Sequence, residues 1–272
     1  MSTIDVHQHT KQQDFDTLAR QLGLKPRDPW IGGTVDYEWD QLRMVLDVMP
    51  LRLPDMHILE FGCNIGASAI LFSYLGAKVC ATDDSADWVA LARLNAERYG
   101  IDNIDFAHVA DSRRLPFADG QFSLIACNSV LEYVSPAELP AVQRELDRVL
   151  APGGLILLTG SSNRIWPREA HSGRWLVNYL PRWIDRLLGK PLPRGVWPWA
   201  MRRGFGPHYD NLDTAQPDNF LLRSRLRGGA GDGQGAGGRR ARCHKGIAWT
   251  ILLTAILNQR HPSGNFNPPV RL

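Results

Sequence analysis

The sequence predicts an α/β protein with a doubly wound, mostly parallel sheet, and three observations support that fold class. Between residues 55 and 160, short apolar runs typical of strands alternate with segments of helical periodicity. Each connection is long enough to join neighbouring parallel strands through a crossover. Glycine or a polar residue follows each of the first strand-like runs, as expected where strands end at a ligand site.

The elements begin with an N-terminal leader. Residues 1–54 predict a helical leader, because apolar residues recur at three-to-four spacing from Asp40 to Met49, before Pro50 and Pro54. The alternating region then predicts strands at residues 57–61, 78–82, 104–109, 122–127 and 155–159, and helices at 67–75, 86–99 and 136–150. Pro152-Gly153-Gly154 predicts a tight turn before the last of these strands.

Composition and charge narrow the class of protein. The chain has 272 residues, of which 44% are hydrophobic, and can bury a sizeable core; its net charge of +3 does not indicate a nucleic-acid partner. The cysteines form no CxxC pair and no zinc-ligand spacing, which favours free thiols and no metal site. Residues 1–20 lack a signal-peptide core, and the apolar run 247–257 is about half of the ~20 residues a membrane span needs. We therefore expect a cytoplasmic protein.

A glycine turn follows the first predicted strand. Gly62 and Gly66 flank Cys63 and Asn64, and they let the backbone turn sharply and approach a ligand. A dinucleotide turn would read G-x-G-x-x-G, but Asn64 replaces its middle glycine and no third glycine follows in register. Glu60, two positions before Gly62, would repel a pyrophosphate and attract an ammonium or sulfonium. The loop therefore favours a cationic cofactor over NAD.

The next strand ends carry polar residues as well. Asp83 and Asp84 follow the second strand, and Asp83 is placed to accept hydrogen bonds from ribose hydroxyls. Asp111, near where an adenine edge would lie, follows the third strand, and Asn128 follows the fourth. Because the carboxyl ends of parallel strands share one edge of the sheet, we expect these residues around one cleft.

These motifs, in this order, resemble those of class I S-adenosylmethionine-dependent methyltransferases. Residues 59–66 match the E-x-G-x-x-x-G form of the first motif, and residues 81–85 match the acidic second motif. Residues 110–125 are similar to the D-x-x-x-L-P-F stretch of the ubiquinone/menaquinone-type (methyltransferase type 11) branch, although Ser123 stands where an acid is usual. Residues 150–154 resemble the turn before the fifth strand. The resemblance covers residues 55–160 and implies a Rossmann-like methyltransferase fold.

The resemblance also implies a role for each site residue. Gly62, Cys63, Asn64 and Gly66 would wrap the amino-acid end of S-adenosyl-L-methionine, and Glu60 would orient the loop or the ammonium. Asp83 would hold the ribose hydroxyls, Asp84 would flank the adenine, Asp111 would accept from the adenine amino group with Ser112 beside it, and Asn128 would line the methionine portion. The implied activity is methyl transfer to a small-molecule or lipid-like acceptor, on oxygen or carbon.

A general base would assist if the acceptor is a hydroxyl or an acidic carbon. His171 is the first candidate, because it lies about a dozen residues after the fifth strand and titrates near neutrality. A loop histidine that binds backbone is the alternative. Tyr133 and Glu132, after the fourth strand, are second candidates, with packing at a helix start as their alternative.

Residues 161–220 form an insertion rich in tryptophan and arginine, with apolar residues at helical spacing from Trp175 to Leu188. Basic residues beside aromatic ones fit a lid on a membrane surface, a pocket for an anionic small molecule, or a nucleic-acid face. An amphipathic helix that covers the sheet is a fourth interpretation. Nucleic acid is disfavoured, since residues 128–131 do not resemble N-P-P-Y and Cys127 has no proline beside it.

The C-terminal part departs from the family. Related chains end with a helix and an antiparallel strand pair that complete a seven-stranded sheet. Residues 211–226 could supply that helix, and residues 247–257 a strand or short helix. Residues 221–272 form a glycine- and arginine-rich tail, predicted to be partly disordered. The tail leaves open a cofactor-binding protein of this fold with impaired activity.

Overall fold

A computed structural model provides the structure of this chain. It describes residues 6–28, 31–48, 51–159, 164–165, 167, 174–181, 183–189, 192, 194, 197, 205–212 and 220–225. These belong to the first of two compact units, Met1–Leu226; the second, Arg227–Leu272, lies outside the described residues together with the predicted elements of the tail. Within the described part of the chain, no helix is long and apolar enough to cross a membrane.

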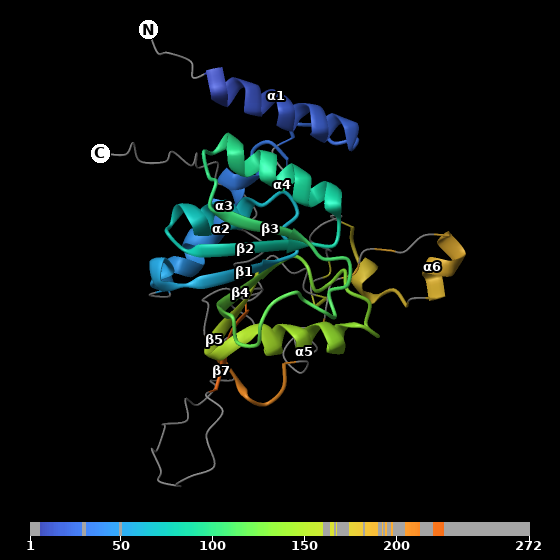
Figure 1. Cartoon of the computed structure of the whole chain (residues 1–272). Coiled ribbons are helices and arrows are strands. Elements are labelled where there is room, and N and C mark those ends of the chain that lie inside the picture. The colour runs from blue at the N-terminus through green and yellow to red at the C-terminus, as the bar shows by residue number, and fades with distance from the viewer. Residues whose placement is uncertain are drawn as a thin grey trace. The chain divides into compact units, whose positions relative to one another are not determined.

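In the described part of the chain, a seven-stranded sheet with the order β3-β2-β1-β4-β5-β7-β6 forms the centre of the first unit (Figure 1). The strands are β1 (His57–Phe61), β2 (Lys78–Asp83), β3 (Ile104–His108), β4 (Phe122–Asn128), β5 (Leu150–Thr159), β6 (Tyr209–Leu212) and β7 (Phe220–Ser224). β1 to β5 are parallel, and β7 is antiparallel to both β5 and β6. The strand order reverses between β1 and β4, which is where doubly wound sheets bind ligands. The predicted fold class is confirmed.

Helices follow the parallel strands as the periodicity predicts. The structure contains α1 (Val6–Gln21), α2 (Thr34–Val48), α3 (Ala67–Tyr74), α4 (Ala86–Arg98), α5 (Leu139–Val149) and α6 (Trp183–Leu188), with 3-10 turns at Leu53–Asp55 and Val177–Tyr179. α1 packs on α4 and α2 packs on α3 (Figure 1). The predicted helical leader is therefore a pair of helices that cover the crossover helices.

The side chains of β1 alternate between the two faces of the sheet. Leu59 and Phe61 join the hydrophobic cluster that contains Val142 and Leu146 of α5. Glu60 points to the opposite face, where it accepts a hydrogen bond from Ser68 at the start of α3. The alternation of a strand thus sends the apolar residues into the core and one carboxylate toward α3.

The sheet is completed earlier in the chain than predicted. A helix over residues 211–226 was the expectation, and it is wrong: β6 and β7 occupy this region, and β7 pairs with β5 from Leu155 to Leu158. Without β7, this edge of β5 would present unpaired backbone groups. Leu221 and Leu222 are both buried, a short apolar run that periodicity alone does not assign to a strand or a helix.

The boundaries of β5 and α5 also differ from the prediction. β5 begins at Leu150, so Pro152-Gly153-Gly154 forms an irregular stretch inside the strand, with Gly153 at φ 78°, rather than a turn before it. α5 begins at Leu139, three residues after Pro136, with Pro140 in its first turn. Proline suits this position because its missing N–H has no partner within a first helical turn.

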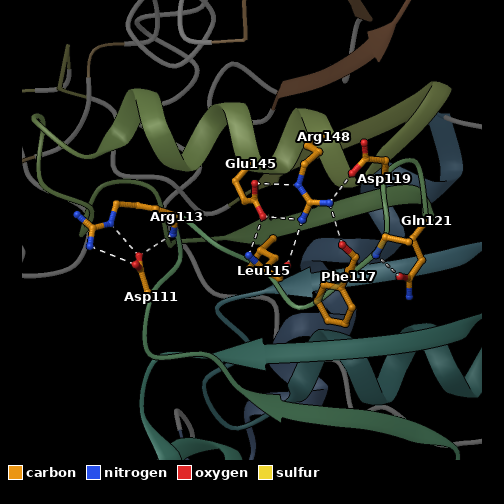
Figure 2. A network of polar contacts seen from close by, with 9 residues as sticks. Asp111, Arg113, Leu115, Phe117, Asp119, Gln121, Glu145 and Arg148 are labelled. Atoms are coloured by element: carbon orange, nitrogen blue, oxygen red, sulfur yellow. Dashed lines mark hydrogen bonds and ion pairs between the residues drawn. The ribbon is translucent and has the colours of Figure 1, made fainter.

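A polar network attaches the loop between β3 and β4 to α5 (Figure 2). Arg148 donates to Glu145 at 2.6 Å and to Asp119 at 2.6 Å, and also to the carbonyl oxygens of Leu115 and Phe117. Glu145 accepts in turn from the backbone N–H of Leu115 at 2.7 Å. One guanidinium thus holds several groups of a loop that has no regular structure of its own.

We expect Arg148→Ala to lower the free energy of unfolding by about 1–3 kcal/mol, because Glu145 and two carbonyl groups would lose a charged partner. The measurement is urea denaturation followed by circular dichroism. Arg144→Ala is the matched control, since Arg144 is exposed on the same helix, and it should change stability by less than about 0.5 kcal/mol. Equal effects of the two substitutions would contradict this role for the network.

Candidate cofactor site

A cavity of about 1000 Å³ opens at the carboxyl ends of β1, β2 and β4. It brings together predicted site residues from four separate strand ends: Glu60, Gly62, Cys63, Asn64, Asp83, Asp84, Asp111, Ser112, Asn128 and Tyr133. Gly66 does not line it, but precedes the first residue of α3. His171 lies outside the described residues. The predicted site residues thus line one cavity. The role of each residue toward the cofactor stays a prediction.

The glycine loop has the backbone that its sequence requires. Gly62 has φ 77°, and a Cβ there would lie 2.5 Å from Cγ2 of Val130, so no larger residue fits. The N–H groups of Gly62 and Cys63 both donate to the carbonyl of Thr82 at 2.8 Å. Asn64 has φ 49°, a left-handed conformation that asparagine tolerates better than most residues. These backbone hydrogen bonds and dihedral angles hold the loop against β2 in one conformation.

Asp83 connects the loops after β1 and β2. Its Oδ2 accepts from the backbone N–H of Asn64 at 2.8 Å, and its Oδ1 accepts from that of Ser85 at 3.0 Å. Burial raises the pKa of Asp83, and these two hydrogen bonds offset part of the rise. A carboxylate has about four lone-pair sites, so Asp83 can still accept from ribose hydroxyls.

Glu60 is the most buried carboxylate of the cavity, with 2% of its surface exposed. Burial, followed by the nearby carboxylate of Glu38, raises the pKa of Glu60 well above its usual range. Hydrogen bonds from Ser68 and from the N–H of Ala69 offset part of the rise. Oε2 of Glu60 is buried and has no hydrogen-bond partner among the described residues. A cationic donor would satisfy this atom.

Acidic side chains dominate the cavity wall. Among the described residues that line it, Glu38, Glu60, Asp83, Asp84, Asp111 and Glu138 are acidic, and Arg113 alone is basic. Such a wall stabilises a positively charged ligand and disfavours a pyrophosphate. The lining therefore fits the ammonium and sulfonium of S-adenosylmethionine better than NAD.

Asp111 lies at the rim of the cavity and is engaged by Arg113 (Figure 2). The guanidinium of Arg113 reaches Oδ1 of Asp111 at 2.8 Å and Oδ2 at 3.2 Å, and it lies 3.4 Å from Glu138. Hydrogen bonds from the Arg113 side chain lower the pKa of Asp111. Asp111 is therefore an ionised acceptor, and an adenine amino group would share it with Arg113.

Sequence reasoning missed Glu38, a buried residue of α2 that lines the cavity. Burial raises its pKa, and hydrogen bonds from Ser68 and Asn128 offset part of the rise. A signal for it exists in the sequence, because Glu38 falls on the same helical stripe as the buried Val35, Leu42 and Val45. A carboxylate at a core position of a leader helix indicates a buried polar site.

The fold and the site together are of the class I methyltransferase type. The strand order places a glycine loop, the carboxylate of Asp83 and other acidic side chains around one cavity at the switch point of the sheet. The orphaned Oε2 of Glu60 and the excess of acids are the features that fit S-adenosyl-L-methionine rather than a dinucleotide.

Comparison with known proteins agrees with this assignment. A family model described as a methyltransferase domain matches residues 58–154. A demethylmenaquinone methyltransferase from Beutenbergia cavernae is 32% identical over 179 residues, covering 65% of this chain and 69% of that protein. A ubiquinone biosynthesis O-methyltransferase from a Bradyrhizobium species is 31% identical over 54% of this chain and 53% of its own length. The chain belongs to the S-adenosylmethionine-dependent methyltransferases.

Solved structures show the same fold. A protein from Pyrococcus horikoshii superposes with a TM-score of 0.53 at 19% identity, covering 70% of this chain and 90% of that protein. A SAM-dependent methyltransferase from Methanosarcina mazei gives a TM-score of 0.50 at 18% identity, covering 64% and 94%. At these identities the likeness supports the arrangement of the sheet and helices only.

We expect Asp83→Ala to weaken binding of S-adenosylhomocysteine by about 10- to 100-fold, since a half-buried carboxylate would no longer accept from the ribose or hold the glycine loop. Isothermal titration calorimetry measures the change. Asp87→Ala is the control, because Asp87 is exposed in the first turn of α4 and does not line the cavity. An unchanged affinity in Asp83→Ala would remove Asp83 from the site.

Proposed function

We propose that this methyltransferase acts on an oxygen or a ring carbon of a quinone-type acceptor, a hydroxylated aromatic ring that carries an apolar tail. The observation that carries the proposal is an apolar segment that follows the cavity in the chain. Relatives named as demethylmenaquinone and ubiquinone methyltransferases support the same acceptor class. The cofactor side of the cavity is acidic, so the acceptor must enter from elsewhere along its wall.

The apolar segment follows β5 in the chain, and the last residue of β5 lines the cavity. Thr159, the last residue of β5, lines the cavity, and the chain continues from there into residues 164–189. Large apolar side chains of this stretch are exposed: Ile165, Trp175, Leu176, Tyr179, Trp183, Leu187 and Leu188, which we call the apolar segment. Trp175 is 71% exposed and Leu187 is 75% exposed. Single exposed apolar residues are normal on a protein surface, but a group of them in one stretch indicates a binding surface. An apolar tail is a ligand that such side chains can cover.

The structure also excludes one interpretation of this segment. An amphipathic helix covering the sheet would bury one face, but none of the residues of α6 is buried. Leu176 adopts a left-handed φ of 62° and Pro181 precedes α6, so the helical spacing from Trp175 to Leu188 is not one continuous helix. The side chains of Trp175, Leu176, Trp183, Leu187 and Leu188 are thus exposed to solvent.

Contact with a membrane surface is part of the proposal, because quinone-type acceptors with long tails partition into lipid. Arg174 and Arg186 are exposed and lie in the same stretch of chain as the apolar side chains. Exposed tryptophan and leucine next to arginine suit the boundary between anionic headgroups and acyl chains. This arrangement supports docking at the membrane without a spanning helix.

Tyr133 is the described residue best placed to act on the acceptor. It lines the cavity and is 70% exposed, on the turn that follows β4 next to Glu132. A phenol at this position can orient an acceptor hydroxyl or relay its proton. His171, the other candidate base, stays a prediction because it lies outside the described residues.

We expect transfer of labelled methyl groups from S-adenosylmethionine to hydroxylated quinone precursors, with Tyr133→Phe lowering kcat by about 10- to 100-fold through loss of its hydroxyl. Affinity for S-adenosylhomocysteine should stay unchanged. Tyr74→Phe is the control, since Tyr74 ends α3 and does not line the cavity. Binding of the cofactor without transfer to any acceptor of this class would contradict the proposed substrate and favour a protein of this fold that only binds cofactor.

We expect the chain to co-sediment with vesicles that contain phosphatidylglycerol, because the apolar segment combines exposed apolar and cationic groups. Replacing Trp183 and Leu187 together by serine should reduce the bound fraction several-fold, and neutral vesicles should bind less than anionic ones. Tyr74→Ser, which removes a large exposed side chain outside the segment, should leave binding unchanged. Equal binding of all variants would exclude the segment as the docking surface.

A further inference from the structure

We propose that Glu38, on the leader helix α2, is a second carboxylate of the cofactor site: together with Glu60 it receives the ammonium of S-adenosyl-L-methionine and releases a shared proton as the cofactor binds. The inference goes beyond methyl transfer to name a residue that selects the cofactor and couples its binding to pH. It rests on the cofactor assignment and does not depend on the identity of the acceptor.

The two carboxylates come from separate elements and meet at one hydroxyl group. Glu38 is 7% exposed on α2, and Glu60 is 2% exposed on β1. Both line the cavity, and both hydrogen-bond to Ser68, the second residue of α3. Asn128, at the end of β4, also bonds to Glu38. Four elements therefore hold the pair in place.

The shared Ser68 hydroxyl supports one proton on the pair. A serine hydroxyl carries one hydrogen, so it donates to one carboxylate only, and it can accept from the other only if that carboxyl is protonated. Two buried negative charges on one cavity wall would also be costly without a cation, and burial raises the pKa of both glutamates. The proposal therefore places one proton on the pair before the cofactor binds.

The surroundings of the pair supply no positive charge to replace that proton. Titratable groups that interact with it are Tyr37 on α2, Cys63 in the glycine loop, Asp83 at the end of β2 and Cys127 on β4. Burial raises the pKa of both thiols, which stay neutral, and Asp83 raises the pKa of Glu60 further. Among the described residues, no cation contributes to the pKa shift of either Glu38 or Glu60.

An ammonium fits this pair where a second proton does not. Oε2 of Glu60 is buried without a hydrogen-bond partner among the described residues and faces the same cavity as Glu38. An ammonium offers three donors and a full positive charge, so it can serve Oε2 of Glu60 and Glu38 together. When it binds, the shared proton leaves to solvent, and the pair carries −2 against the +1 of the ammonium.

This arrangement predicts how binding depends on pH. The pair must lose one proton to bind the cation, so affinity for a cationic ligand rises with pH up to the raised pKa of the pair, by at most tenfold per pH unit. A ligand that lacks the ammonium gains nothing when the pair loses its proton. The carboxylate of that ligand would then lie near two ionised glutamates, Glu38 and Glu60, and would be repelled by them.

The test compares S-adenosylhomocysteine with its deaminated analogue, which keeps the carboxylate and lacks the ammonium, by calorimetry in buffers of different ionisation enthalpy. The full-length wild-type chain should release a proton on binding S-adenosylhomocysteine, and its affinity should rise with pH above the ordinary titration range of a glutamate. Glu38→Gln should bind S-adenosylhomocysteine about 10- to 100-fold more weakly, release fewer protons than wild type, and bind the analogue at least as well as wild type.

Asp40→Asn is the matched control. Asp40 is a buried carboxylate on the same helix, paired with Arg43 at 3.2 Å, and it does not line the cavity, so both ligands should bind to this variant as they do to wild type. If circular dichroism shows that Glu38→Gln fails to fold, Glu38→Asp replaces it in the test. Aspartate keeps the carboxylate but places it one methylene farther from the ligand. This variant should keep proton release while losing part of the affinity.

Three results would overturn the role of Glu38 and leave the enzyme class intact. Wild type binds S-adenosylhomocysteine without releasing a proton, Glu38→Gln weakens both ligands equally, or Glu38→Gln leaves the affinity for S-adenosylhomocysteine unchanged. Failure of wild type to bind S-adenosylhomocysteine at all would instead overturn the cofactor assignment, and this proposal with it.

Discussion

A carboxylate buried at the switch point of the sheet is the constraint on which the rest of the site depends. Glu60 is fixed there by the alternation of β1, which sends Leu59 and Phe61 to the opposite face and into the core. Burial makes its negative charge costly unless a cation or a proton accompanies it. The glycine loop, the Ser68 hydroxyl and the surrounding acids all lie around this charge and form a site for a cation.

The leader helices take part in this arrangement and are not an appendage. α2 packs on α3, and it is α3 that supplies Ser68 to both Glu38 and Glu60. The leader and the cofactor site are therefore joined by direct contacts. The leader thereby closes one wall of the cavity, to which Ile31, Thr34 and Tyr37 also contribute.

The surface that we propose for the acceptor rests on a different physical basis. There the chain exposes large apolar side chains after β5, whereas the cofactor side concentrates carboxylates around the ends of β1 and β2. The division suits a reaction between a cationic donor and an apolar acceptor, because each partner is held by groups that do not attract the other. Methyl transfer needs alignment and exclusion of water more than acid-base catalysis.

The sequence by itself determined the parallel core and most of the cavity, because strand ends, glycine turns and carboxylates are local features whose positions follow once the sheet is doubly wound. Glu60, Asp83 and Asn128 were found in this way. Tertiary structure alone decided what depends on contacts between distant segments. Leu221 and Leu222 became a strand because β5 had an edge to pair, and Glu38 became a site residue because α2 packs where Glu60 is buried. Periodicity in the sequence predicts which face of a helix or strand a residue lies on, but only tertiary packing decides which residues contact that face.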